Sequence, residues 1–143
     1  MLFRSHSSDV FYRQPSDAKP TYWEKLRDED GRIFTGCNVE NAAFTPTSCA
    51  ERTALFKAVS EGVTKFTDIA VVGSRRGEIN QQITSPCGVC RQALFEFGGP
   101  ELNVIMAKTP DDFMERSMDE LLPFGFGPSN VAGNQAVEDE KED

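Results

Sequence analysis

Two apolar runs along the chain, at residues 69–72 and 102–107, are the length of strands and carry no alternating polar positions. Such runs are typical of strands that lie inside a sheet covered on both faces. Residues 21–27 and 32–35 also favour strands, and the turn signal Asp28-Glu29-Asp30-Gly31 separates them. This spacing predicts a β-hairpin ahead of the buried strands.

Helical spacing of apolar residues separates the strands, and the helix ends carry recognisable signals. The first helix begins with a capping-box pattern, Ser48 followed by Glu51, and stops at Gly62. The second opens at Pro86 and stops at Gly98-Gly99, and a short third helix covers 117–122. The side chains expected to face inward are Ala54, Leu55, Ala58 and Val59 in the first helix and Val89, Ala93, Leu94 and Phe97 in the second.

Alternation of strands and helices predicts an α/β fold, a three-layer α-β-α sandwich around one mixed central sheet. The length of 143 residues suits a single domain. Residues 1–20 are rich in serine and proline without a period and are expected to form an irregular arm. The folded domain is expected to span 21–128, followed by an acidic disordered tail at 129–143.

Charge and composition exclude several classes of function. The chain carries 15 basic and 23 acidic residues, a net charge of −8, which disfavours a polynucleotide partner. A single histidine, His6, rules out a histidine-based triad or a multi-histidine metal site. No apolar run has the ~18 residues of a membrane span, and residues 1–9 lack a signal-peptide core. The expected compartment is the cytoplasm, where the four cysteines would be reduced thiols or metal ligands.

Three of the four cysteines fall at predicted helix starts. Cys49 opens the first helix, and Cys87 and Cys90 open the second in a Cys-x-x-Cys pattern. Helix N-termini favour the thiolate that metals bind, so the three sulfurs could ligate one zinc ion and leave its fourth position open for water. A redox pair or two buried thiols would give the same Cys-x-x-Cys spacing. The remaining thiol, Cys37, is expected to be a small buried hydrophobic residue rather than a ligand.

Charged neighbours of these cysteines suggest further chemistry. Glu51 stands two residues after Cys49, where its carboxylate could move a proton, although it also fits the last position of the capping box. Arg52 and Arg91 each adjoin a cysteine and could offset the negative charge of three thiolates, or could simply be solvated helix charges.

The segments Cys49-Ala50-Glu51-Arg52 and Pro86-Cys87-Gly88-Val89-Cys90-Arg91-Gln92 together resemble the cytidine deaminase family, small zinc enzymes that act on free nucleosides. The resemblance extends over residues 26–128. It implies one zinc ion per subunit on the three cysteines, Glu51 as the proton shuttle, and contact between the Ala50 backbone and the base. The implied reaction is hydrolytic deamination of cytidine and 2′-deoxycytidine in pyrimidine salvage.

Two further segments carry the resemblance. In Gly36-Cys37-Asn38-Val39-Glu40-Asn41-Ala42, the family pattern assigns Asn38 and Glu40 to the ribose hydroxyls, whereas taken alone Asn38 and Asn41 could cap a turn and Glu40 could be a surface acid. In residues 121–128, Phe126 matches an aromatic ring that covers the nucleoside of a neighbouring subunit, or could belong to the local core. The resemblance thus implies a homotetramer with shared sites.

The chain departs from the family before Leu26. Members usually begin with a helix and then a pocket-lining strand of Phe-x-Val-Gly-Ala-x-Leu type, both of which are missing or altered here. Trp23 and Glu24 occupy the glycine and alanine positions, where they would crowd the pocket wall and bury a charge. A frame error or wrong gene start, a truncated relative without activity, and a variant with a reshaped pocket all fit. The alternative function is a non-catalytic, zinc-stabilised subunit that acts only in assembly.

Overall fold

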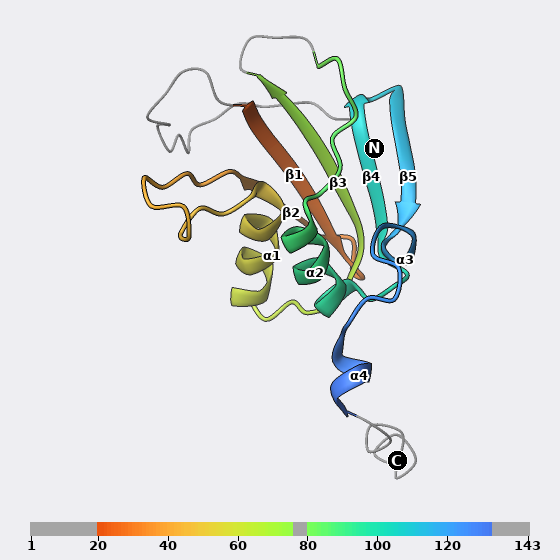
Figure 1. Cartoon of the computed structure of the whole chain (residues 1–143). Coiled ribbons are helices and arrows are strands. Elements are labelled where there is room, and N and C mark those ends of the chain that lie inside the picture. Colours follow the sequence, from red (N-terminus) through yellow and green to blue (C-terminus); the bar gives the residue numbers. More distant parts are fainter. Residues whose placement is uncertain (1–19, 76–79, 133–143) are drawn as a thin grey trace.

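A mixed sheet of five strands, in the order β2-β1-β3-β4-β5, carries the helices of this protein (Figure 1). The computed structural model describes residues 20–75 and 80–132, with the backbone alone for 20–24, 74 and 75. The elements are β1 (Pro20–Asp28), β2 (Ile33–Cys37), α1 (Ala50–Ser60), β3 (Phe66–Arg75), α2 (Gly88–Gly98), β4 (Asn103–Thr109), β5 (Asp112–Ser117), α3 (Met118–Leu121) and α4 (Pro128–Ala132). The predicted α/β class and mixed sheet are therefore confirmed.

Strands β3 and β4 pair in parallel, and the other three pairings are antiparallel. The predicted hairpin is present as β1 and β2, and its turn is held by the buried Asp28. The carboxylate of Asp28 accepts hydrogen bonds from the backbone of Asp30 and from the backbone and side chain of Arg32. Burial opposes ionisation of Asp28, but these bonds together lower its pKa. Strand β5 was not predicted, because this edge strand lacks an apolar run. Most of its residues are exposed, Glu115 and Arg116 among them.

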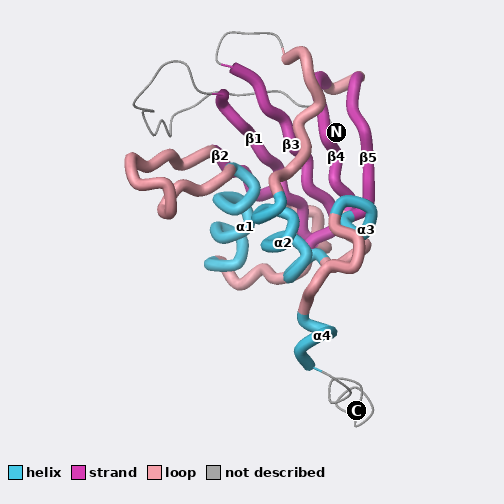
Figure 2. Tube along the Cα trace, viewed as in Figure 1, coloured by secondary structure: helices cyan, strands magenta, loops and turns pink. Residues whose placement is uncertain are grey.

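Helices α1 and α2 lie side by side on one face of the sheet, as Figure 2 shows in cyan against the magenta strands. Helix α1 packs against β1 and β2, α2 packs against β3, and α3 contacts β5 and α2. Between helices and sheet lies the core, formed by Leu26, Phe34, Ala54, Leu55, Ala58, Val63, Phe66, Ile69, Val71, Leu94, Phe95, Leu102, Val104, Met106 and Met118. No helix is seen on the opposite face within the described residues, so the third layer of the predicted sandwich stays a prediction.

Both helix starts differ from the sequence expectation. The capping box predicted at Ser48 is wrong, because Ser48 pairs with Val39 in an isolated β-bridge and its hydroxyl contacts the Cys49 carbonyl. The N-cap of α1 is Cys49, without a side-chain cap. Likewise α2 begins at Gly88 with Cys87 as its N-cap. A capping box is present at the start of α3, where the side chains of Ser117 and Glu120 each accept a hydrogen bond from the other's backbone N–H group.

The inward face predicted for α1 is confirmed, but that of α2 needs one correction. Val89 is 62% exposed, because it lies outside the buried side of α2, which begins at Cys90. Instead of Val89, Phe95 completes the buried surface of α2 together with Leu94. Phe95 was not expected to be buried, because the partner that covers it comes from a later segment of the chain.

The first strand, whose sequence departs from the family pattern, is part of the sheet. Strand β1 lies between β2 and β3, with Trp23 paired to Cys37 and Val72, and Glu24 paired to Gly36 and Val71. The backbone of this strand is therefore present with an altered sequence rather than displaced from the sheet.

Both ends of the chain are only partly described. The expected arm lies outside the described residues except for Pro20, which begins β1. The expected disordered tail begins with helix α4, at 128–132, and its remainder lies outside the described residues. None of the helices that the structure describes is long and apolar enough to cross a membrane.

A very close approach of β2 to α1 fixes the level at which α1 begins. A Cβ atom built on Gly36 would lie 2.2 Å from the Ala50 carbonyl oxygen and 2.5 Å from the Ala54 nitrogen. Further along α1, Lys57 Nζ donates to the Thr35 carbonyl of β2 at 2.5 Å. Because backbone atoms cannot turn aside as a flexible side chain can, only glycine fits at position 36.

We expect Gly36→Ala to lower the free energy of unfolding by about 1–3 kcal/mol, the usual cost of an extra methyl group in a packed core. Urea unfolding of metal-saturated protein measures the change. Gly88→Ala is the matched control, because a Cβ there meets nothing within 4 Å. Equal stability of Gly36→Ala and the wild type would contradict the close packing.

Candidate metal centre

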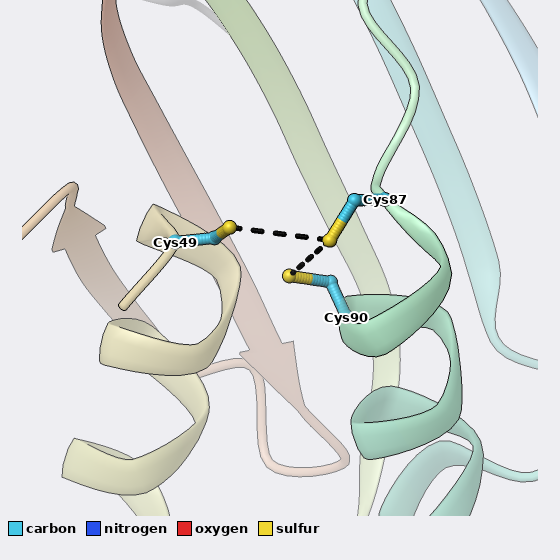
Figure 3. A group of neighbouring side chains, drawn as sticks. All are labelled: Cys49, Cys87 and Cys90. Carbon is cyan, nitrogen blue, oxygen red and sulfur yellow. Dashed lines mark hydrogen bonds between the residues drawn. The ribbon is translucent and has the colours of Figure 1, made fainter. Parts of the chain in front are cut away.

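Three cysteine sulfurs converge at the adjacent N-termini of α1 and α2. Figure 3 shows Cys49 at the start of α1 pointing toward Cys87 and Cys90 at the start of α2. The Cys49 and Cys87 sulfurs are 3.9 Å apart, and those of Cys87 and Cys90 are 3.4 Å apart. All three sulfurs lie within 4.8 Å of one another. The three thiols that were grouped from the sequence are therefore close together in the structure, although they come from two separate segments.

This spacing suits a metal ion better than a disulfide. Thiolates at about 2.3 Å from a tetrahedral zinc ion lie roughly 3.8 Å from each other, close to the observed separations. A disulfide needs sulfurs about 2.0 Å apart, and all four cysteines of the chain are free. Cys37 stays outside the cluster as the half-buried last residue of β2, so it is less buried than expected. The participation of Cys49 favours a metal centre over a Cys-x-x-Cys redox pair.

The electrostatics of the cluster differ between its two neighbouring thiols. Burial opposes ionisation of Cys87, but the backbone N–H of Cys90 and the thiols of Cys90 and Cys49 together lower its pKa. Burial, and next the nearby charge of Glu51, raise the pKa of Cys90. A divalent cation among the sulfurs would favour the thiolate form of all three. The donor set thus fits zinc, whose soft thiolate ligands are common in proteins.

Glu51 lies buried beside this cluster, on the first turn of α1. Its side chain is 6% exposed, and burial raises the pKa of its carboxyl group. Hydrogen bonds from its own backbone N–H and the Cys90 thiol act in the opposite direction. With Cys49 as the N-cap, Glu51 is the second helical residue and not the capping-box residue. A buried carboxyl group with a raised pKa is suited to accept and return a proton.

The two arginines next to the cysteines have different surroundings. Arg52 donates to the Cys49 sulfur at 3.6 Å, and this bond is the main reason for its raised pKa. Its Nε atom is buried and has no hydrogen-bond partner among the described residues. Arg91 instead donates to the carbonyl groups of Pro86 and Leu121 and to the Ser85 hydroxyl. Arg52 can therefore offset thiolate charge directly, whereas Arg91 fixes the backbone that leads into Cys87.

The segment after β2 reaches the start of α1. The side-chain oxygen of Asn38 accepts a hydrogen bond from the backbone N–H of Ala50 at 3.2 Å, so Asn38 supplies the cap that Cys49 does not. Asn41 closes a turn by accepting from the N–H of Ala43. Glu40 is half-buried between these two asparagines. Asn38 thus stands beside the cluster with its amide NH₂ group still able to donate to a ligand.

Phe126 does not belong to the local core, because its ring is 62% exposed. Its backbone carbonyl accepts a hydrogen bond from Gln92 of α2 at 2.7 Å. Sequence reasoning gave no role to Gln92, Phe95 or Gly36, although the Gly-Phe-Gly pattern at 125–127 was a signal that a bulky group lies against this segment.

Known proteins resemble this chain in sequence and in fold. Residues 26–106 match the family described as the cytidine and deoxycytidylate deaminase zinc-binding region. A cytidine deaminase of Sporosarcina psychrophila is 43% identical over 107 residues, 75% of each chain. One of Halalkalibacterium halodurans is 41% identical over 98 residues, 68% of this chain and 70% of the relative. The crystal structure of cytidine deaminase from Burkholderia pseudomallei superposes with a TM-score of 0.70 at 39% identity, covering 79% of this chain and 86% of the other.

The fold and the cysteine cluster define a zinc-binding α/β domain, and its cofactor is zinc. The chain belongs to the cytidine deaminase family. The match to the family begins at residue 26, the same position at which the sequence returns to the family pattern.

We expect Cys87→Ser to lower both the zinc content and the thermal midpoint, because metal binding and folding are coupled. Elemental analysis and a thermal melt measure the two quantities. Cys37→Ser is the control that should keep both, since Cys37 lies outside the cluster. Unchanged zinc stoichiometry in Cys87→Ser would disprove its role as a ligand.

Proposed function

We propose that this protein hydrolyses the 4-amino group of cytidine and 2′-deoxycytidine, giving the uridine products and ammonia in pyrimidine salvage. One observation carries the proposal: three convergent thiols lie against a single buried carboxyl group, Glu51. Zinc held by Cys49, Cys87 and Cys90 would supply Lewis acidity that lowers the pKa of a water molecule. The names of the related proteins support cytidine as the substrate.

Glu51 moves the protons of the reaction. Its carboxylate takes a proton from the attacking water and gives it to N3 of the base, and a second transfer converts the amino group into ammonia. The water oxygen forms the new bond to C4 and the C4–N4 bond breaks, so no oxidant or reductant is required. The burial that raises the pKa of Glu51 favours the protonated form that this carboxyl group adopts between the two transfers.

The segments around the cluster bind the nucleoside. Asn38 and Glu40 hold the ribose hydroxyls, because an amide donor and a carboxylate acceptor side by side match a diol. The backbone of Ala50 contacts the base at the start of α1. Arg52 stays on the Cys49 sulfur and Arg91 on the Pro86 carbonyl, so both keep the thiols in place.

Assembly completes the site. Phe124 and Phe126 expose their rings on one short segment, and Phe44 is 91% exposed in the loop before α1. An exposed apolar surface, such as the one that Phe124 and Phe126 form on this segment, is typical of a site covered by another chain. We propose a homotetramer in which Phe126 covers the nucleoside of a neighbouring subunit.

The compartment follows from the thiols. All four cysteines are free, and three of them must be thiolates to bind zinc. A reducing environment preserves that state, so the cytoplasm is the proposed location. A polynucleotide partner stays disfavoured by the net charge of −8.

A second candidate is supported by the altered strand β1. Glu24 and Trp23 lie in β1, an inner strand of the sheet, at positions where the family pattern has alanine and glycine. A chain with such a change could keep zinc and the assembly without the reaction. A folded, zinc-loaded wild type that leaves cytidine unchanged would favour this structural role.

Replacing Glu51 tests the reaction. We expect Glu51→Ala to lower kcat by about 10²–10⁴-fold, the usual contribution of a positioned proton-transfer group. The loss of cytidine absorbance measures the rate, and Glu51→Gln controls for side-chain size. Both variants should retain zinc, because Glu51 is not one of the three sulfur donors. Activity above about a tenth of the wild type would refute the shuttle role.

The assembly is tested by mass in solution. We expect light scattering to give about four times the chain mass of 15.9 kDa. A monomer at micromolar concentration would rule out the shared site.

A further inference from the structure

A short segment after α3 is held against the outer side of α2 by a contact that leaves no free space. The ring of Phe95 lies between Gly125 and Gly127, where Cβ atoms would approach its carbons to 2.8 and 2.7 Å. Neither glycine has the positive φ that favours this residue type. The close ring contact, not backbone conformation, therefore explains why both positions are glycine.

A hydrogen bond fixes the residue between these glycines. Gln92 Nε2, one turn before Phe95 on α2, donates to the Phe126 carbonyl at 2.7 Å. Beyond it, the side chain of Asn130 accepts from the N–H of Gly127 at 2.8 Å. The backbone on both sides of the Phe126 ring is thus held, while the ring itself stays exposed.

The conformation of the preceding residue shows that the segment is constrained. Phe124 has a φ of 56°, the left-handed region that non-glycine residues rarely adopt, and its ring is fully exposed. A residue keeps such a conformation only where its surroundings determine it. Exposed rings contribute little to holding their own backbone, so the constraint comes from α2.

We propose that Gln92 and Phe95 are positioning residues that hold segment 123–128 so that the Phe126 ring projects outward to a second copy of this chain. This inference rests on the proposed function, in which Phe126 covers a neighbour's nucleoside. Helix α2 then carries two parts of the machinery, because its first turn presents Cys87 and Cys90 and its next turns hold Phe126. A fixed ring loses less freedom on meeting its partner than a mobile one, which strengthens binding.

The bond from Gln92 is suited to a test because it lies on the surface. Its loss leaves no polar group buried, so the fold should survive. Gln92→Glu keeps the size of the side chain but replaces the donor by an acceptor facing the Phe126 carbonyl. Glu96→Ala, exposed one turn later on α2, is the matched control.

We expect Gln92→Ala and Gln92→Glu to raise KM for cytidine about three- to tenfold, the range for loss of one hydrogen bond, with kcat and zinc content nearly unchanged. Phe126→Ala should raise KM at least as much. Because Gln92 acts through Phe126, the double variant Gln92→Ala/Phe126→Ala should have the KM of Phe126→Ala alone. Additive effects, or a wild-type KM in both Gln92 variants, would overturn the inference.

A second measurement needs no activity. Amide hydrogen exchange of residues 124–127 should be faster in Gln92→Ala and unchanged in Glu96→Ala. If the wild type fails to deaminate cytidine, the proposed function fails, and exchange together with assembly decides the inference. Gln92→Ala must then both speed exchange and shift the mass toward smaller species. Unchanged exchange, or faster exchange with unchanged assembly, would overturn the positioning role.

Discussion

The site depends on one constraint, which is that helices α1 and α2 begin side by side. Gly36 allows the backbone of β2 to touch that of α1, and this contact sets where Cys49 stands above the sheet. Helix α2 lies beside α1 and follows β3, so Cys87 and Cys90 arrive at the same level. Three sulfurs from two separate segments therefore meet, and those of Cys49 and Cys87 lie 3.9 Å apart.

Both helices have a cysteine at the N-cap position, where its sulfur can bind a metal but does not cap the helix. Serine, threonine or aspartate at an N-cap normally stabilises a helix, yet Cys49 and Cys87 occupy that position without a side-chain cap. The N–H groups left at the helix start favour negative charge, and one of them, from Cys90, lowers the pKa of Cys87. Asn38 recovers part of the lost capping at α1 through Ala50. The two helix starts are thus less stable without side-chain caps, but their cysteines can bind a metal.

The sequence was most informative where local patterns and chemistry coincide. The cysteine spacing, the hairpin at residues 20–37 and the inward face of α1 follow from short-range rules, and all are present. Tertiary contacts decided the rest. Ser48 fits a capping box in the sequence, but it pairs with Val39 in the structure. Phe95 belongs to the core, and the distant Gly125 and Gly127 cover its ring. Strand β5 has no pattern of its own, since its partner β4 determines it.

Zinc X-ray absorption of the purified protein tests the central claim most directly, because it counts the atoms around the metal. Three sulfur neighbours at about 2.3 Å with one lighter atom at about 2.0 Å are predicted, since three cysteines leave one position open. Four sulfur neighbours would mean that Cys37 closes the site, and a shell without sulfur would place the metal elsewhere. Either result would contradict a catalytic centre built on the two helix starts.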